Sequence, residues 1–399
     1  MSLSLSKKAA QVKPSSTLAI SAKAGELKAQ GIDVVGFGAG EPDFKTPDDI
    51  CNAAISAIRN GFTKYTPASG TAELKEVICR KFNDFNHIHY DPDQIVVSNG
   101  GKHTLTNVFQ AILNKGDEVI IPSPYWLSYP EMVRLNDGKP VFVRADKAAS
   151  YKVTAAQIEA AVTDKTKALI LNSPNNPTGM IYTKKELHDI AELAVKHDFY
   201  IVSDEIYEYL IYGGEKHYSV ASFSKKIYDR TITCSGLSKT YSMTGWRIGY
   251  CGAPKEIAKM IGAVQSHLTS NPNSIAQKAA VEAISGPQGT VEIMRKEFNK
   301  RRLYMIERIA AMPYVDMMEP KGAFYAFVDV SAALEKNYQG KKVGDTMRLA
   351  QILLEDFHVA LVPCTDFGLP DHVRLSYVLG FAQIEKGMDR IESFLRTLT

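Results

Sequence analysis

The sequence has few cysteines, and none of the five is arranged as a pair. Cys51, Cys79, Cys234, Cys251 and Cys364 lie far apart and form no C-x-x-C motif. This spacing disfavours a disulfide framework or a zinc site and favours free thiols in a reducing cytoplasm. The chain also lacks an apolar run of about 18 residues, and its N-terminus, M-S-L-S-L-S-K-K, lacks the apolar core of a signal peptide. We therefore expect a soluble, cytoplasmic protein.

The sequence also lacks a strong excess of charge of either sign. It has 47 Lys and Arg against 44 Asp and Glu, a formal net charge of +3 at pH 7. Such a balance excludes the dense positive surface typical of proteins that bind nucleic acids or membranes. With 399 residues, of which 45% are hydrophobic, the chain can bury a large core in two or three packed units. We therefore expect neither a nucleic acid nor a membrane as a partner.

Short apolar segments alternate with helical ones through the first two thirds of the chain. Strands are expected at 95–98, 118–122, 140–144, 168–172, 199–204, 231–236 and 248–252, and helices are expected between most of them. Near-continuous apolar strands separated by helices predict a mostly parallel sheet that helices cover on both faces. Ligands of such sheets bind beyond the carboxyl ends of the strands.

The last part of the chain has a different pattern and predicts a smaller α/β domain. A long charged helix near 288–312 is followed by strands at 323–328, 359–363 and 373–377, with helices at 343–356 and 384–398. We predict an N-terminal arm joined to the small domain (1–47), a large domain (48–286) and a small C-terminal domain (287–399).

The most informative stretch is S-G-L-S-K-T-Y-S-M-T-G-W-R-I-G, residues 235–249. Lys239 stands among small and hydroxylic residues, which leave room for a ring-sized ligand. A lysine amine becomes a nucleophile when burial or a nearby cation lowers its pKa. Arg247, eight residues later, has the forked geometry that binds a phosphate. By itself, a lone lysine is more often an ordinary surface residue.

Polar residues follow two of the expected strands. Asp204 ends an apolar strand, where a carboxylate must be paired or solvated, and it could bind a protonated ring nitrogen or simply cap the next segment. Tyr207 follows three residues later. Asn176, in N-N-P-T-G, precedes a proline that keeps its backbone extended. Its amide and the phenol of Tyr207 could both bind a ring hydroxyl.

Two further segments could bind the rest of such a ligand. Gly100 and Gly101, in N-G-G-K-H, expose backbone amides at the start of a helix, which favours an anion. Lys102 gains nothing there from the helix dipole but would gain from a phosphate. Trp126, in S-P-Y-W-L-S-Y-P, offers either a flat surface for a ring or ordinary core packing.

Together these motifs resemble the class I aminotransferases, fold type I enzymes that depend on pyridoxal 5'-phosphate. The resemblance runs from K-P-S at 13–15 to R-L-S-Y at 374–377 and is strongest to the bacterial aspartate aminotransferase subgroup. It implies that Lys239 forms an imine with the cofactor and moves the proton, while Asp204 pairs with the ring nitrogen. It also implies that Tyr207 and Asn176 bind the ring hydroxyl and that Trp126 stacks on the ring. Gly101, Lys102 and Arg247 would bind the phosphate. The implied substrate-binding residues are Arg374, Asn176, Trp126 and Gly40.

The resemblance also implies a homodimer with shared active sites, because Tyr65 resembles a tyrosine that reaches the phosphate of the neighbouring subunit. Two departures stand out. Gly236 replaces a serine that binds the phosphate in many relatives, so Ser235 or Ser238 would substitute for it. The segment S-H-L-T-S-N-P-N-S lacks the arginine that reads a substrate side-chain carboxylate in the better-known branch. We predict that Lys13 replaces this arginine and binds the side-chain carboxylate of the substrate. The alternative is that Lys13 is an ordinary solvated charge.

We therefore predict an aminotransferase that moves an amino group between an L-amino acid, aspartate first, and 2-oxoglutarate. Aromatic, prephenate or alanine specificity stays open, as does a β-carbon–sulfur lyase, which needs the same lysine and cofactor. A ligand-sensing regulator built on the same fold is disfavoured because the sequence shows no appended DNA-binding unit and no basic patch.

Overall fold

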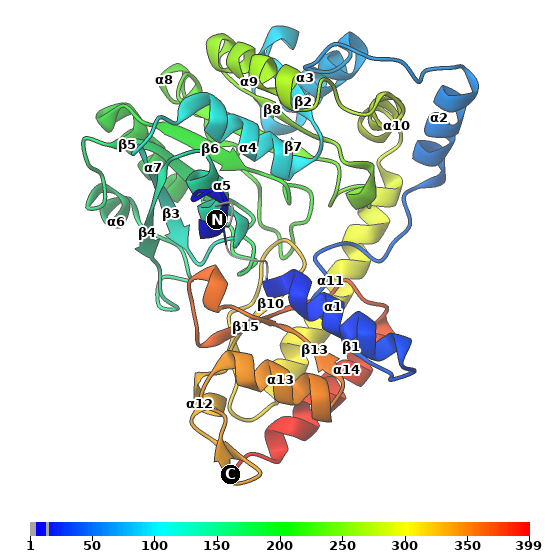
Figure 1. The fold of residues 1–399 in the computed structure, drawn as a ribbon, viewed down its shortest axis with the longest axis vertical. Helices are drawn as coiled ribbons and strands as arrows, with labels where there is room; N and C mark the ends of the chain where they lie inside the picture. The colour runs from blue at the N-terminus through cyan, green and yellow to red at the C-terminus, as the bar shows by residue number, and fades with distance from the viewer. Residues whose placement is uncertain (1–4, 13–15) are drawn as a thin grey trace, which may run out of the picture.

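A computed structural model describes residues 5–12 and 16–399, which form two bodies (Figure 1). The large body, at the top of Figure 1, contains a seven-stranded sheet, and the small body below it contains a four-stranded sheet. The long helix α11 (Gly289–Ala310) runs from one body into the other (Figure 1). The domain limits given above remain a prediction.

The large sheet is mostly parallel, as the sequence predicts. Its strand order is β2-β8-β7-β6-β5-β3-β4, and only β8 runs antiparallel to its neighbours. The strands are β2 (Ile95–Ser98), β3 (Glu118–Ser123), β4 (Lys139–Arg144), β5 (Thr166–Asn172), β6 (Tyr200–Asp204), β7 (Thr231–Gly236) and β8 (Gly249–Gly252).

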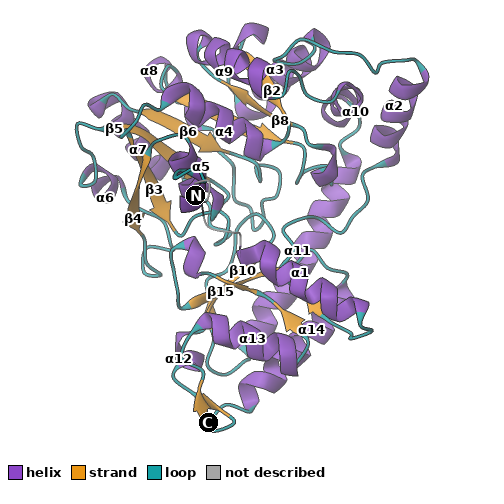
Figure 2. Ribbon diagram, viewed as in Figure 1, coloured by secondary structure: helices purple, strands orange, loops and turns teal. Residues whose placement is uncertain are grey.

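Helices cover both faces of this sheet (Figure 2). Because side chains alternate along a strand, Ile170 packs with one group of helices and Leu171 with the other. One face is covered by α4 (Gly101–Ile112), α5 (Ser128–Leu135) and α9 (Lys255–Leu268). The other is covered by α3 (Ala72–Asn86), α6 (Ala155–Glu159), α7 (Lys184–His197), α8 (Lys225–Tyr228) and α10 (Ser274–Ser285). Helix α2 (Asp48–Arg59) packs against α10 at the edge of the large body (Figure 1).

Local sequence signals explain where several of these helices begin. Thr183 and Glu186 form a capping box at the start of α7, and the Thr71 hydroxyl accepts from the Leu74 amide at the start of α3. All five cysteines are free thiols, and three of them are buried. Over residues 5–12 and 16–399, no helix has the length and apolar character needed to span a membrane.

The small body is built on the antiparallel sheet β14-β15-β10-β9. Its strands are β9 (Asp316–Met317), β10 (Tyr325–Asp329), β14 (Val362–Pro363) and β15 (His372–Ser376), and a separate hairpin joins β11 (Asn337–Tyr338) to β12 (Lys341–Lys342). Around them lie α1 (Ser16–Ala29), α12 (Ser331–Leu334), α13 (Thr346–Asp356) and α14 (Phe381–Arg396).

The single strand predicted at 359–363 is wrong. The chain forms β13 (Val359–Ala360), which pairs in parallel with β1 (Val35–Gly36), and then β14, which pairs with β15 in the four-stranded sheet. The five apolar residues therefore serve two sheets in succession. Periodicity cannot reveal this change of partner, because both halves are buried and extended.

The carboxyl ends of β5, β6 and β7 and the loops that follow them lie on the side of the large sheet that faces the small body (Figure 1). Hydrogen bonds cross between the bodies there, from Arg374 to Asn176 and between Tyr207 and Tyr325. The candidate site therefore lies between the two sheets.

Candidate active site

Lys239 follows β7, and its ammonium group points to the N-terminal segment before α2. Its Nζ donates to the Gly40 carbonyl at 2.5 Å and lies 5.9 Å from the centre of the Phe324 ring. Burial lowers the pKa of this lysine to about 8. The cations Arg374 and Arg247 also lower it, whereas the Glu41 carboxylate acts to raise it. A far larger share of the amine is therefore neutral near neutral pH than on a surface lysine, so it can act as a nucleophile or a base.

Asp204 is the last residue of β6 and is 5% exposed. Its Oδ2 accepts from the Tyr129 hydroxyl at 2.6 Å, and its Oδ1 accepts from the Ile206 amide at 3.2 Å. The Ile206 contact is the local capping that the sequence allowed as an alternative. Burial nevertheless raises the pKa of Asp204 to about 6, although its hydrogen bonds and the nearby Lys239 act to lower this pKa. A cation at this carboxylate would stabilise its charged form.

Tyr207 and Asn176 lie beside this carboxylate on the loops after β6 and β5. The Tyr207 hydroxyl is 2.7 Å from that of Tyr325, and burial raises the pKa of Tyr207 well above its ordinary value, so the phenol stays protonated. Asn172 holds the two loops together. Its side chain accepts from the Asn176 amide at 2.8 Å and donates to the Asp204 carbonyl at 3.0 Å.

Arg374, on β15 of the small body, is 2% exposed and completes the site from the opposite side. It donates to Asn176 Oδ1 at 3.0 Å and to the Gly38 carbonyl at 3.1 Å, while its buried Nε has no partner. Among the residues that the structure describes, no carboxylate forms an ion pair with this guanidinium. A buried, unpaired cation with a free donor is suited to a carboxylate ligand.

An anion site lies where α4 begins. Arg247, in the left-handed region at φ 58°, donates to the Thr244 carbonyl at 2.8 Å and lies close to Gly100. Gly100 must lack a side chain, because its φ is +90° and a Cβ would collide with the guanidinium of Arg247. Gly101 opens α4, so its amide is available at the helix N-terminus. These groups supply the donors that a phosphate requires.

The structure favours Ser238 over Ser235 as the hydroxyl that replaces the serine missing at Gly236. Ser235 donates to Glu208 Oε1 at 2.7 Å and is buried away from the loop. Ser238 is buried as well, but no side-chain partner occupies its hydroxyl among the contacts of the described residues. Its hydroxyl is therefore free to bind an anion.

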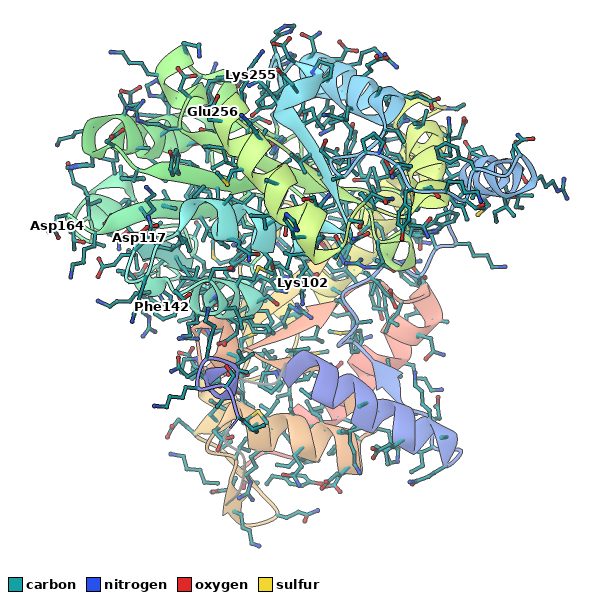
Figure 3. All side chains as sticks on the ribbon, turned by 45° about the horizontal axis from the view of Figure 1, so that its top comes forward. Lys102, Asp117, Phe142, Asp164, Lys255 and Glu256 are labelled. Atoms are coloured by element: carbon teal, nitrogen blue, oxygen red, sulfur yellow. The ribbon has the colours of Figure 1, made fainter. Side chains whose placement is uncertain are left out.

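Lys102 and Trp126 lie together on the large body. The Lys102 Nζ is 5.0 Å from the centre of the partly buried Trp126 ring, and burial and Arg247 both lower the pKa of Lys102. Figure 3 shows Lys102 on the side of the large body that faces the small one. Trp126 also packs edge-on against Tyr129, so the structure connects it to the Asp204 carboxylate.

Two residues of the predicted set remain, Tyr65 and Lys13. Tyr65 is 90% exposed on the single chain. Lys13 lies outside the described residues. The segment between α9 and α10 (269–273) contains no arginine.

Three site residues were missed in the sequence analysis, namely Tyr129, Asn172 and Tyr325. Tyr129 belongs to the S-P-Y-W-L-S-Y-P motif and Asn172 ends the strand A-L-I-L-N. Their positions near the ends of predicted strands could therefore have identified both. Tyr325 carried none, because it lies in the small body and meets Tyr207 across 118 residues of sequence.

Comparisons with known proteins agree with this geometry. The profile of the family described as aminotransferase class I and II matches residues 32–391. An aspartate aminotransferase of Bacillus sp. (strain YM-2) is 49% identical over 96% of this chain and 97% of its own length. An aspartate/prephenate aminotransferase of Cereibacter sphaeroides is 46% identical over 99% of each chain. The aspartate aminotransferase of Thermus thermophilus with maleate superposes with a TM-score of 0.93 at 42% identity, over 99% of this chain and 100% of that one.

Proposed function

This chain belongs to the class I and II aminotransferase family, and we propose that it transfers the amino group of L-aspartate to 2-oxoglutarate, with pyridoxal 5'-phosphate bound at Lys239. The observation that carries the proposal is the Lys239 amine, whose pKa of about 8 keeps it reactive beside the Asp204 carboxylate and the unpaired Arg374 guanidinium. One amine, one carboxylate and one carboxylate-binding group are what an amino acid reaction on this cofactor requires.

The residues present fit the cofactor. Burial and the nearby cation Arg247 lower the pKa of Lys102 in the absence of an anion, and a phosphate beside Gly101 and Ser238 would offset this effect. Asp204 would hold the protonated ring nitrogen, Tyr207 and Asn176 the ring hydroxyl, and Trp126 the face of the ring. When bound, pyridoxal phosphate supplies the electron sink that makes the α-proton of an amino acid acidic.

The chain's own residues then account for binding and proton transfer. Arg374 would bind the α-carboxylate through Nε, its buried donor without a partner, while Asn176 and Gly38 fix the rest of the guanidinium. The neutral Lys239 amine would take the α-proton and hold it at Nζ until it is given back in the second half of the 1,3-proton shift. Its contact with the Gly40 carbonyl holds Nζ in the site between these two acts.

Aspartate is proposed because relatives 46–49% identical over nearly the whole chain carry that substrate in their names. Similar relatives are named aspartate/prephenate aminotransferases, so prephenate, a 2-oxo acid, is the second candidate acceptor. Initial rates with aspartate, glutamate, phenylalanine and alanine, each with 2-oxoglutarate, oxaloacetate and prephenate, would separate the two. Pyruvate and ammonia from a β-substituted amino acid without a keto acid would instead indicate a lyase.

A direct experiment tests the proposed attachment. The protein reconstituted with pyridoxal phosphate should absorb visible light, and borohydride followed by peptide mapping should locate the label on Lys239. Lys239→Ala should lose both the label and turnover. A label on another lysine, or normal turnover of Lys239→Ala, would refute the proposal.

We also propose a cytoplasmic homodimer in which Tyr65 reaches the phosphate of the partner subunit. The support is that Tyr65 is 90% exposed on one chain, close in sequence to Ile55 and Ile58 of α2, which are also exposed. Hybrid dimers test this. A hybrid of Tyr65→Ala and Lys239→Ala subunits has one intact site if Tyr65 acts across the interface, and none if it acts within its own subunit.

A further inference from the structure

Buried polar side chains form a network next to Asp204 that the proposed reaction does not use. Glu205 continues the ladder of β6, because its amide donates to the Cys234 carbonyl at 2.8 Å. Successive side chains of a strand point to opposite sides, so Glu205 projects away from the site that Asp204 faces. The members, called the Glu205 network below, are Lys81, Asn86, Ser203, Glu205, Glu208, His217, Ser219 and Ser235.

Hydrogen bonds fix the Glu205 carboxylate from both sides. Its Oε1 accepts from the Ser203 hydroxyl at 2.8 Å, and its Oε2 accepts from the Ser219 hydroxyl at 2.6 Å and from His217 Nε2 at 2.8 Å. The amide nitrogen of Asn86 lies 3.2 Å from the same oxygen. Four partners, all able to donate, are the environment of a charged carboxylate.

The second carboxylate of the network is neutralised within it. Lys81 Nζ is 2.5 Å from Glu208 Oε1, and both side chains are at most 4% exposed. The charge of Glu208 is therefore balanced by a buried ammonium. The Ser235 hydroxyl and the Asn86 side-chain amide also donate to this carboxylate, each at 2.7 Å. Glu205 has no such ammonium among the residues that the structure describes.

His217 does not balance the charge of Glu205 either. Its Nε2 bonds to Glu205, while its buried Nδ1 has no partner. A doubly protonated ring would bury a charged N–H without an acceptor, so the geometry favours the neutral ring with its proton on Nε2. The ligand atoms of Glu205, Glu208 and His217 lie within 4.8 Å of one another, as in some metal sites, but Lys81 already supplies the cation there. The network thus retains one net negative charge.

We propose that Glu205 is a positioning residue for the aminotransferase reaction. Its network holds its negative charge directly behind Asp204. There the charge helps to keep one proton shared between the Asp204 carboxylate and the ring nitrogen of the cofactor. This inference rests on the proposed function. A like charge next to Asp204 makes the loss of that shared proton harder. The negative charge of Glu205 already contributes to the raised pKa of Asp204, behind burial as the main cause.

Several other titratable groups face the pair and stay unchanged in the test below. Those around Asp204 are Tyr129, Tyr207, Cys234 and Lys239, and those around Glu205 are Tyr90, Glu208, His217 and Tyr250. Burial raises the pKa of each of these tyrosines and of Cys234, so they remain neutral over the working range. Removing the charge of Glu205 thus changes the electrostatics at Asp204 while all of these groups are kept.

The test is Glu205→Gln, which keeps the shape of the side chain and removes its charge. Two quantities are measured on the reconstituted protein. The first is the pH midpoint of the visible absorption of bound pyridoxal phosphate. The second is the dissociation constant of the cofactor, which is measured by tryptophan fluorescence. We expect the midpoint to fall by about one pH unit and the dissociation constant to rise about tenfold. An unchanged midpoint in a folded variant overturns the proposal.

The matched control is the double variant Lys81→Met/Glu208→Gln. It disturbs the same buried network but removes one charge of each sign, so we expect an unchanged midpoint. An equal shift in the control would mean that the network matters only for packing and would also overturn the proposal. If Glu205→Gln does not fold, Ser203→Ala/Ser219→Ala replaces it, and a smaller fall is expected because two donors to Glu205 are lost. Borohydride labelling of Lys239 in the parent protein is done first, so that failure of the proposed function is recognised separately.

Discussion

Arg374 and Asn176, 198 residues apart in the sequence, are joined by a hydrogen bond of 3.0 Å from a guanidinium nitrogen to the amide oxygen. The bond ties β15 of the small body to the loop after β5 of the large body. The residue proposed to bind the substrate carboxylate is thereby fixed by a residue proposed to bind the cofactor ring. A shift of one body relative to the other would displace both groups together.

Arg374→Lys should raise the KM for every amino acid substrate by about tenfold or more, because an ammonium cannot replace the planar fork of a guanidinium. The effect on kcat should be smaller. Steady-state kinetics with aspartate and alanine would measure both constants. A loss limited to dicarboxylic substrates would show that Arg374 reads the side chain instead.

The reactivity of Lys239 in the apoprotein should follow its lowered pKa of about 8. Only the neutral amine is nucleophilic, so the rate of cofactor attachment should rise with pH, with a midpoint near 8, and level off above it. Stopped-flow absorbance between pH 6.5 and 9.5 would give this profile. A rate that still rises in proportion to hydroxide up to pH 9.5, without levelling off, would mean that the pKa of the amine is not lowered.

Asp204→Asn should stabilise the apoprotein above pH 6 while it abolishes most of the activity. The folded-state pKa of Asp204 is about 6, above its ordinary value of 3.8, so the stability that its proton contributes is present below pH 3.8 and is lost as the pH rises through 6. Asparagine cannot ionise, so it should avoid a cost of roughly 1–3 kcal/mol at pH 8. Thermal unfolding of the apoprotein at pH 4 and pH 8 would measure this difference.

The same variant should lose roughly 100-fold or more in kcat, because the protonated ring nitrogen loses its ionic partner. A variant that is more stable and still active would show that Asp204 only caps the segment after β6. Tyr129→Phe is the matched control, since it removes one hydrogen bond to Asp204 but keeps its charge.

Lys13→Ala should reduce kcat/KM for aspartate about thirtyfold, equivalent to about 2 kcal/mol, if this lysine pairs with the side-chain carboxylate. Alanine as donor should be unaffected because it offers nothing to pair with. Lys102→Met is the comparison variant, because Lys102 is a cation on the large body next to Trp126 and could pair with the same carboxylate. A selective loss of aspartate activity in Lys102→Met alone would transfer the role to Lys102.

The sequence alone determined the large sheet, because most of its strands are short apolar runs bounded by turn residues. It also determined which residues stand near the strand ends, since Asp204 ends its strand and Lys239 lies three residues after the strand that precedes it. Helix starts such as the Thr183 capping box depend on local signals as well. These features depend on neighbours a few residues apart.

Only the tertiary structure decided which distant side chains meet. The division of 359–363 between two sheets depends on strand pairings within the small body. The pairing of Tyr207 with Tyr325 and the unpaired Nε of Arg374 depend on how the two bodies pack together. The perturbed pKa values of Lys239 and Asp204 likewise arise from burial, which no local pattern measures. The motifs could therefore name the groups of the site, but their distances and charge states exist only once the chain has packed around them.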